Sequence, residues 1–156
     1  MAADDASADS AGTADVPGAP KKKRGYIEAL PTETRMIHPI FPGSTNHYDT
    51  LFGGQAMAWM DQVAFICATR WCRRKVVTAY SSAIDFHISV PVGTIVELIA
   101  RLEKVGRSSM TVQVEMWFEP MNRPERTLAC EGTFVMVALD EENNPVSVPA
   151  LPQPAE

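Results

Sequence analysis

The spacing of the hydrophobic residues divides the chain into a helical stretch and a series of strands. From about Leu51 to Arg74 the sequence contains no proline and is rich in Ala, Met and Trp, and this run is too long for an ordinary strand. It predicts one long helix with apolar residues on nearly every side. Such a helix must be covered by other elements on several sides, because its apolar surface is otherwise left in water.

The segments on either side of the helix have the character of strands. Residues 34–40 are a short strand candidate, which Pro39 and the loop residues after it bring to an end. After the helix, residues 76–88 are β-branched and aromatic, while residues 94–105 and 109–119 alternate between apolar and polar positions. A short turn at Gly106–Ser108 joins the two alternating stretches as a hairpin. Residues 126–140 supply another long strand.

The order of strand, helix and then four strands predicts an α+β fold. A single antiparallel sheet of about five strands can cover an apolar helix on several sides only by curling around it. We expect one domain over residues 25–149, since the chain has no internal repeat and no second hydrophobic pattern. Residues 1–24 are poor in large aliphatic side chains and are expected to be a disordered tail, and residues 150–156 a flexible C-terminal tail.

Composition and charge narrow the classes of partner. The net charge of −5 argues against nucleic acid or an anionic membrane, since either requires a concentrated basic face. Lys21–Arg24 is interpreted as a solvated charge run, with a localisation signal or a phosphate-reaching arm as the alternative. No stretch reaches the roughly 18 apolar residues of a membrane span, and the start of the chain lacks a signal peptide pattern. Three cysteines without a CxxC pair indicate reduced thiols, so we expect a cytoplasmic protein with a small-molecule substrate.

One acidic residue interrupts the apolar helix. Asp61 has Met57, Ala58, Ala64 and Phe65 as its facing neighbours, at three and four residues on either side. An ionised carboxylate among such groups is costly, so it must find hydrogen-bond donors, be neutralised, or lie at an interface with access to water. Acids in such places cluster at functional sites. A structural role, with the carboxylate bonded to a backbone amide or an arginine, is the alternative.

Glycines and a polar loop lie at the predicted start of this helix. Gly53 and Gly54 let a ligand or another backbone approach closely, and the free N–H groups of a helix start suit a developing oxyanion. The preceding Ser44, Thr45 and Asn46 supply hydroxyls and an amide, or simply cap or turn the chain. The stretch therefore predicts a place where a carbonyl group can be polarised.

The spacing of Gly54 and Asp61 constrains how the two can act together. They are seven residues apart, which puts them on one face of the helix but separates them by roughly 10 Å at 1.5 Å per residue. One substrate carbonyl cannot contact both. If both act on it, the donor and the acid come from different copies of the helix related by a two-fold axis. The spacing therefore predicts two identical sites across a homodimer.

Three segments of the chain resemble the hot-dog-fold acyl-CoA thioesterases, in particular the bacterial acyl-CoA hydrolases and the cytosolic long-chain acyl-CoA hydrolases. They are FPGSTNHYDTLFGGQAMAWMDQVAFICATR, VGRSSMTVQVEMW and TFVMVALD. The resemblance covers about residues 34–149 and depends on a combination of features. These are an Asn six residues before the Phe of FGG, the two glycines, the acid seven residues after the second glycine, and the GRSS segment.

The resemblance implies a hot-dog fold, a long central helix wrapped by a curled antiparallel sheet, and dimers joined into a continuous sheet, often as a trimer of dimers. It implies hydrolysis of acyl-CoA to a free acid and CoA. Asp61 would be the general base or nucleophile, Asn46 its partner in holding water or the thioester, and the Gly54 N–H the group that polarises the carbonyl.

The resemblance also implies a substrate-binding role for Gly53 and for the GRSS segment, which matches the region near the CoA phosphates. The residues of that segment are Gly106, Arg107, Ser108 and Ser109, with Arg107 either a charge contact or a solvated hairpin residue. One position departs from the pattern: many relatives have glycine where this chain has Asp49, which bears on backbone geometry and chain-length preference.

Two other functions fit parts of this pattern. Related hot-dog hydratases and dehydratases use a loop histidine with a helix acid, and His47 follows Asn46 directly. A non-catalytic acyl-CoA-binding module is the second alternative, although it would not need Asp61. His38 and His87 have no ligand spacing and no Cys/His cluster is present, so we expect no metal and no cofactor apart from the CoA of the substrate.

Overall fold

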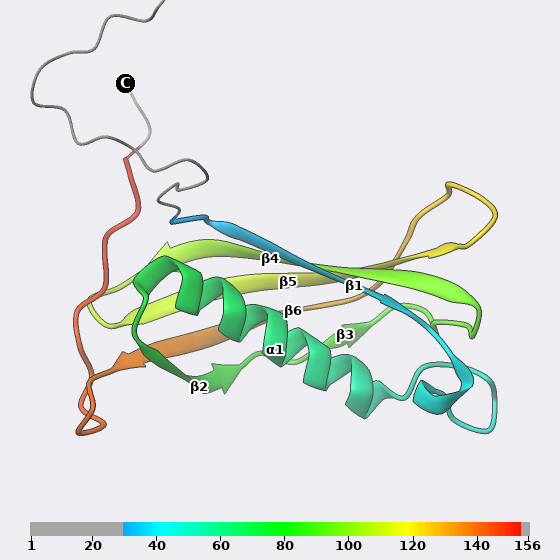
Figure 1. Ribbon diagram of the computed structural model, residues 1–156, viewed down its shortest axis with the longest axis horizontal. Helices are drawn as coiled ribbons and strands as arrows, with labels where there is room; N and C mark the ends of the chain where they lie inside the picture. The colour runs from blue at the N-terminus through cyan, green and yellow to red at the C-terminus, as the bar shows by residue number, and fades with distance from the viewer. Residues whose placement is uncertain (1–29, 154–156) are drawn as a thin grey trace, which may run out of the picture.

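A computed structural model of the protein describes residues 30–153 (Figure 1). The elements follow in chain order as β1 (Glu33–Pro39), the short 3-10 helix η1 (Pro42–Ser44), α1 (Gly53–Cys72), β2 (Lys75–Ser81), β3 (Asp85–Phe86), β4 (Thr94–Val105), β5 (Ser109–Pro120) and β6 (Thr127–Leu139). The expected tail over residues 1–24, with its Lys21–Arg24 run, lies outside the described residues. The predicted long helix and the predicted strand before it are confirmed, within two residues at each boundary.

The strands form one antiparallel sheet in the order β1-β4-β5-β6-β2, with β3 beside β6. The predicted hairpin between residues 94–105 and 109–119 is confirmed as the β4–β5 pair. The stretch over residues 76–88 forms two strands and not one, because the pairing with β6 stops after Ser81 and resumes at Asp85. The sheet has six strands and does not close on itself, so β1 and β2 are its edges.

Helix α1 lies across one face of the sheet (Figure 1). Its inward side is fully apolar and packs on β4, β5 and β6, through Ala56, Met60, Val63, Ala64, Cys67, Ala68, Trp71 and Cys72. On the opposite side, no part of residues 30–153 covers the helix, and Met57 is 46% exposed and Phe65 44% exposed. The helix also contacts β1 and β2 at the two edges of the sheet, so the sheet curls around its inward side as predicted and leaves its outer side exposed.

The C-terminal end of α1 is held by its own cap and by the chain that follows β6. Arg73 is the C-cap in the left-handed conformation, with φ at 54°. Trp71 Nε1 donates to Pro149 O at 2.9 Å, and Leu151 packs against the core. Arg70 donates to Thr34 Oγ1 at 2.8 Å, which ties this end of the helix to β1.

Candidate active site

The N-terminal end of α1 presents backbone N–H groups without a side-chain cap. Phe52 is the N-cap and makes no side-chain hydrogen bond, and the first N–H with a backbone acceptor is that of Ala56, which donates to Phe52 O at 3.0 Å. A methyl group added at Gly53 would come no closer than 3.8 Å to Phe86, and one added at Gly54 would meet nothing within 4 Å. The glycines therefore leave open space beside donors that carry the positive end of the helix dipole.

A cavity of about 380 Å³ lies beside this end of the helix. Asn46 and Gly53 line it, together with a buried apolar wall made of Leu51, Ala56, Val90, Met116, Ala129 and Cys130. Further lining comes from Thr50 and from residues 86–89 around β3. An apolar wall combined with a few polar groups is typical of a site for a small molecule.

Asn46 is held by its own loop. Its Oδ1 accepts hydrogen bonds from Tyr48 N at 2.9 Å, Thr50 N at 3.2 Å and Thr50 Oγ1 at 3.1 Å. Asp49 follows in the left-handed conformation with φ at 59°, and its carbonyl accepts the Val92 N–H. Because Oδ1 is occupied, the Asn46 Nδ2 group is the part of the side chain available to donate to a ligand.

Asp61 lies elsewhere on the helix and is partly exposed. Thr78 Oγ1, on the edge strand β2, donates to Asp61 Oδ1 at 2.6 Å. Asp61 makes no ion pair with any residue in the 30–153 range, and it does not line the cavity. The sequence left open how the Asp61 carboxylate is accommodated. In the structure it accepts a hydrogen bond and is also accessible to water.

Thr78 is a contact of Asp61 that the sequence pattern did not predict. Its contact with Asp61 depends on how β2 lies against α1, and the register shift after Thr78 is not visible in the sequence. The only sequence feature that could have pointed to Thr78 is a hydroxyl residue near the start of the first strand after the helix, and such a feature is common. His87 and Ser89, which line the cavity, were also missed as site residues.

The GRSS segment lies far from the cavity, at the other end of the sheet. Gly106 N donates to Ser109 O at 2.8 Å, and Ala138 N donates to Ser108 O at 2.9 Å. The carbonyl of Arg107 accepts the Val148 N–H at 2.8 Å, so the turn is fixed to the chain after β6. Within one chain, the expected site residues therefore lie in three separate places. These are the helix start with Asn46, the middle of the helix with Asp61, and the GRSS turn.

Cys130 and His47 lie near the cavity or the Asn46 loop and could be considered as reacting groups. Cys130 lines the cavity, and burial raises the pKa of its thiol to about 11, with Glu131 adding to the effect. The thiol is therefore protonated at neutral pH and is a poor nucleophile. His47 is exposed and does not line the cavity, and its ring lies tilted against that of Tyr48 with ring centroids 3.9 Å apart.

Within residues 30–153 there is no cluster of His, Cys, Asp and Glu side chains that could hold a metal ion. The same part of the chain has no helix with the length and apolar character needed to cross a membrane.

The fold agrees with comparisons to known proteins. Residues 48–125 match the family model of the thioesterase superfamily. An uncharacterised acyl-CoA thioester hydrolase of Zymomonas mobilis is 41% identical over 110 residues, which is 70% of this chain and 74% of that protein. The chain therefore belongs to the thioesterase superfamily.

Solved structures place it more closely within the hot-dog-fold acyl-CoA hydrolases. An apo-hexameric acyl-CoA thioesterase superposes with a TM-score of 0.76 at 35% identity, with 80% of each chain covered. The acyl-CoA hydrolase of Staphylococcus aureus, solved in complex with butyryl-CoA and CoA, superposes with a TM-score of 0.74 at 32% identity over 80% of this chain and 76% of that one. The predicted hot-dog fold is confirmed.

Proposed function

We propose that this protein is an acyl-CoA thioesterase, which hydrolyses acyl-CoA thioesters to a free carboxylic acid and CoA. The observation that carries the proposal is the arrangement of two features on α1. A partly exposed carboxylate, Asp61, accepts a hydrogen bond from Thr78 of β2, and the uncapped N–H groups at the start of the same helix border an apolar cavity. The relatives support it, since those compared above are named as acyl-CoA hydrolases or thioesterases.

The chemistry follows from these groups. The acyl chain occupies the cavity, and the thioester carbonyl oxygen accepts hydrogen bonds from the Gly54 N–H and the Asn46 Nδ2 group. These donors stabilise the negative charge that develops on that oxygen as the carbonyl carbon is attacked. Gly53, which lines the cavity beside them, allows the thioester to approach the helix closely.

Asp61 supplies the other half of the reaction by one of two routes. As a general base it takes a proton from water, whose oxygen forms the new bond to the carbonyl carbon as the C–S bond breaks. As a nucleophile it forms an anhydride with release of CoA, and water then cleaves the anhydride. Both routes end with the acid, CoA and a regenerated carboxylate, and neither requires a cofactor.

The site requires two copies of the chain. Gly54 and Asp61 are seven residues apart on α1, roughly 10 Å at 1.5 Å per residue, so one protomer's acid cannot reach the carbonyl held at its own helix start. We propose a homodimer in which the partner's acid completes each site. The uncovered side of α1, with Met57 and Phe65 exposed, and the open edge of β2 support such a pairing. A hexamer built as a trimer of dimers is the larger assembly we propose, because related thioesterases are described as hexameric.

Variants of the Staphylococcus aureus enzyme support the choice of residues. That enzyme was crystallised with alanine in place of an asparagine, an aspartate and a threonine, spaced 15 and 17 residues apart. Asn46, Asp61 and Thr78 have the same residue types at the same two spacings in this chain. The agreement supports treating the three as one site, and it brings in Thr78, which we assign as a positioning residue for the acid.

A cytoplasmic location is part of the proposal. A mouse relative named as a cytosolic acyl coenzyme A thioester hydrolase is 31% identical over 122 residues, although this chain spans only 32% of its length.

Hydrolysis of an acyl-CoA series, followed by release of free thiol, tests the proposed function with wild type and Asp61→Asn side by side. Removal of an acid–base group typically costs about 100-fold or more in rate, so Asp61→Asn should lose at least that while its thermal unfolding is unchanged. A variant that keeps more than a tenth of the wild-type rate would show that Asp61 is not the reacting acid. Enoyl-CoA tests the hydratase alternative, since its rapid hydration by the wild type would overturn the assignment.

A further inference from the structure

The cavity beside the start of α1 ends at a defined point on the sheet. Met116 of β5 and Cys130 of β6 are register partners, and both are buried and line the cavity. Val114 and Gly132 are the next inward-facing pair along the same two strands, and neither lines the cavity. The cavity therefore ends between these two pairs, which are roughly 7 Å apart along the strands at 3.3 Å per residue.

Two side chains fill the space over Gly132. A glycine leaves room where other residues have a side chain, so the cavity would continue over Gly132 if nothing else occupied that room. A methyl group added at Gly132 would overlap Ile84 Cδ1 and would lie 3.7 Å from Met60 Cε. Met60 also borders the last residue of the cavity wall, since its Sδ lies 3.7 Å from Cys130 Sγ. Ile84 and Met60 therefore close the inner end of the cavity.

Ile84 is held in place from both sides. It lies in the short segment between β2 and β3. Before it, Ser82 N donates to Thr133 O at 2.8 Å, and Thr133 N donates to Ser82 Oγ at 2.9 Å. After it, β3 pairs with β6. Because the chain is bonded to β6 on both sides of Ile84, this side chain has a fixed position against the core.

Ile84 can change in size with less effect on the core than Met60. Met60 is fully buried in the middle of the inward side of α1, directly before Asp61. Ile84 is only partly buried and belongs to a connection between two strands. Ile84 is therefore the residue of the two whose size can alter the cavity without removing a central part of the core.

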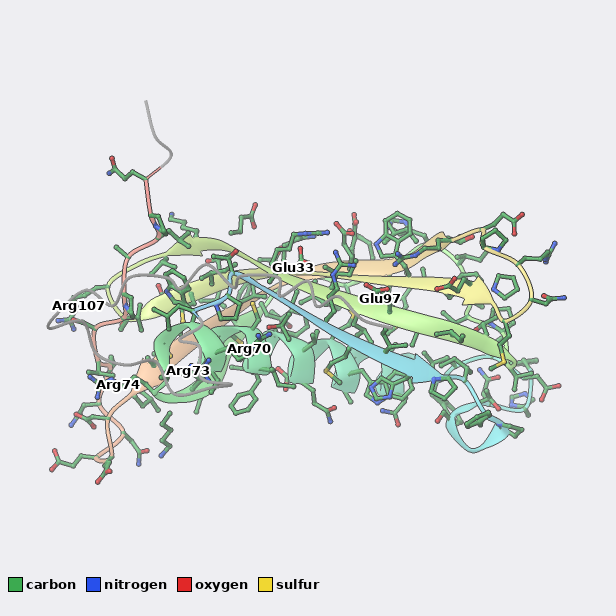
Figure 2. The ribbon with its side chains drawn as sticks, turned by 45° about the horizontal axis from the view of Figure 1, so that its top comes forward. Glu33, Arg70, Arg73, Arg74, Glu97 and Arg107 are labelled. Atoms are coloured by element: carbon green, nitrogen blue, oxygen red, sulfur yellow. The ribbon has the colours of Figure 1, made fainter. Side chains whose placement is uncertain are left out.

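Beyond Gly132 the interior is packed. Val112 and Phe134, the following inward-facing pair of β5 and β6, are both buried. Core side chains continue from there towards the end of the molecule where α1 stops, and Arg73 and Arg107 lie at that end (Figure 2). The space over Gly132 is therefore where a smaller side chain would lengthen the cavity along the sheet.

The size of the cavity also limits its occupant. At about 380 Å³ it is near the small end of the range of about 300–1,000 Å³ that small-molecule sites span. The thioester group takes up part of this space. A short- or medium-chain acyl group therefore fits, whereas a long chain must extend into water or displace the residues at the inner end.

We infer that this cavity selects short- and medium-chain acyl groups, and that Ile84, lying over Gly132, sets the longest chain it admits. The inference rests on the proposed function and names the substrate class of the same site. Each methylene group buried in the cavity strengthens binding about fourfold, so kcat/KM rises with chain length until the chain reaches Ile84. Beyond that length the gain stops, because the next methylene group finds no free space.

Hydrolysis of a series from acetyl-CoA to palmitoyl-CoA tests the inference. The wild type should reach its highest kcat/KM at or below decanoyl-CoA. Ile84→Val removes Cδ1, the atom over Gly132, and should raise kcat/KM about fourfold for the next longer substrate of the series. Ile84→Ala opens more space and should raise it about tenfold for that substrate. Both variants should stay within twofold of wild type for butyryl-CoA.

Ile37→Ala is the matched control, because Ile37 is 63% exposed on β1 and does not line the cavity. Its chain-length profile should equal that of the wild type. Melting temperatures show which variants are folded, and Ile84→Val decides the question if Ile84→Ala is not. A wild type that prefers palmitoyl-CoA would overturn the inference. A folded Ile84 variant whose profile does not move to longer chains, or that loses rate equally at every length, would also overturn it.

A binding measurement separates this inference from the proposed function. Calorimetric titration of the acyl-CoA series into Asp61→Asn, with and without Ile84→Val, reports the chain-length limit without turnover. Affinity should stop rising at the wild-type limit and rise further when Ile84 is valine. Affinities independent of chain length would contradict the inference alone. A wild type that binds the series with this limit and hydrolyses none of it would contradict the proposed function alone.

Discussion

Thr78 Oγ1 donates to Asp61 Oδ1 at 2.6 Å, and this hydrogen bond ties the edge strand β2 to the middle of α1. The bond fixes the direction of the carboxylate and leaves Oδ2 without a protein donor in the described part of the chain. A carboxylate with one oxygen held and the other free is suited to take a proton from water or to attack a carbonyl carbon. The edge strand β2 therefore contributes the hydrogen-bond donor that orients Asp61.

Thr78→Val should lower kcat by roughly tenfold, because a hydrogen bond to a charged group contributes about 1.5–3 kcal/mol and its loss frees the carboxylate to rotate. KM and the melting temperature should change little, since Thr78 is exposed on an edge strand. Thr78→Ser keeps the hydroxyl and should recover most of kcat. Equal losses in the serine and valine variants would contradict a role for the hydroxyl.

Gly54→Ala should separate activity from stability. The added methyl group meets no other atom within 4 Å, and alanine is favoured over glycine in a helix by up to about 1 kcal/mol, so the free energy of unfolding should be unchanged or higher. Hydrolysis should fall, because the methyl group occupies the space where the thioester approaches the helix N–H groups. Gly43→Ala, also with no atom within 4 Å, is the control and should keep full activity. An equally active Gly54→Ala would argue against an oxyanion site at the helix start.

The buried thiols predict a loss of stability at alkaline pH. Burial raises the pKa of the Cys67 thiol and of the Cys130 thiol from the ordinary value of 9.0 to about 11. The thiols ionise first in the unfolded state, so this contribution to stability is intact below pH 9 and is lost as the pH rises towards 11. Melting temperatures measured at pH 8 and pH 10.5 check this prediction. The fall in melting temperature between the two pH values should be smaller in the double variant Cys67→Ala/Cys130→Ala than in wild type. The same fall in both proteins would contradict the prediction.

Much of the fold can be predicted from the hydrophobic pattern, because the helix lacks proline and the long strands alternate over most of their length. Val96, Leu98, Ala100 and Leu102 are all buried, as the alternation within β4 requires. The division of residues 76–88 into β2 and β3 cannot be predicted this way, because it depends on where the pairing with β6 stops and resumes and not on residue type.

The site is predictable to a lesser extent. The separation of Gly54 from Asp61 follows from the rise of a helix, and the structure agrees that one chain keeps Asp61 out of the cavity. Thr78 and the residues around β3 come near the site only through tertiary packing.

A complementation assay tests the two-protomer site most directly. Asn46→Ala and Asp61→Asn, each inactive alone, are unfolded together, refolded as a random mixture and assayed for acyl-CoA hydrolysis. A site that takes Asn46 from one protomer and Asp61 from its partner is intact once in every mixed dimer, so the mixture should regain about a quarter of the wild-type rate. A mixture that regains no activity, although mixed dimers are present, would contradict the shared site.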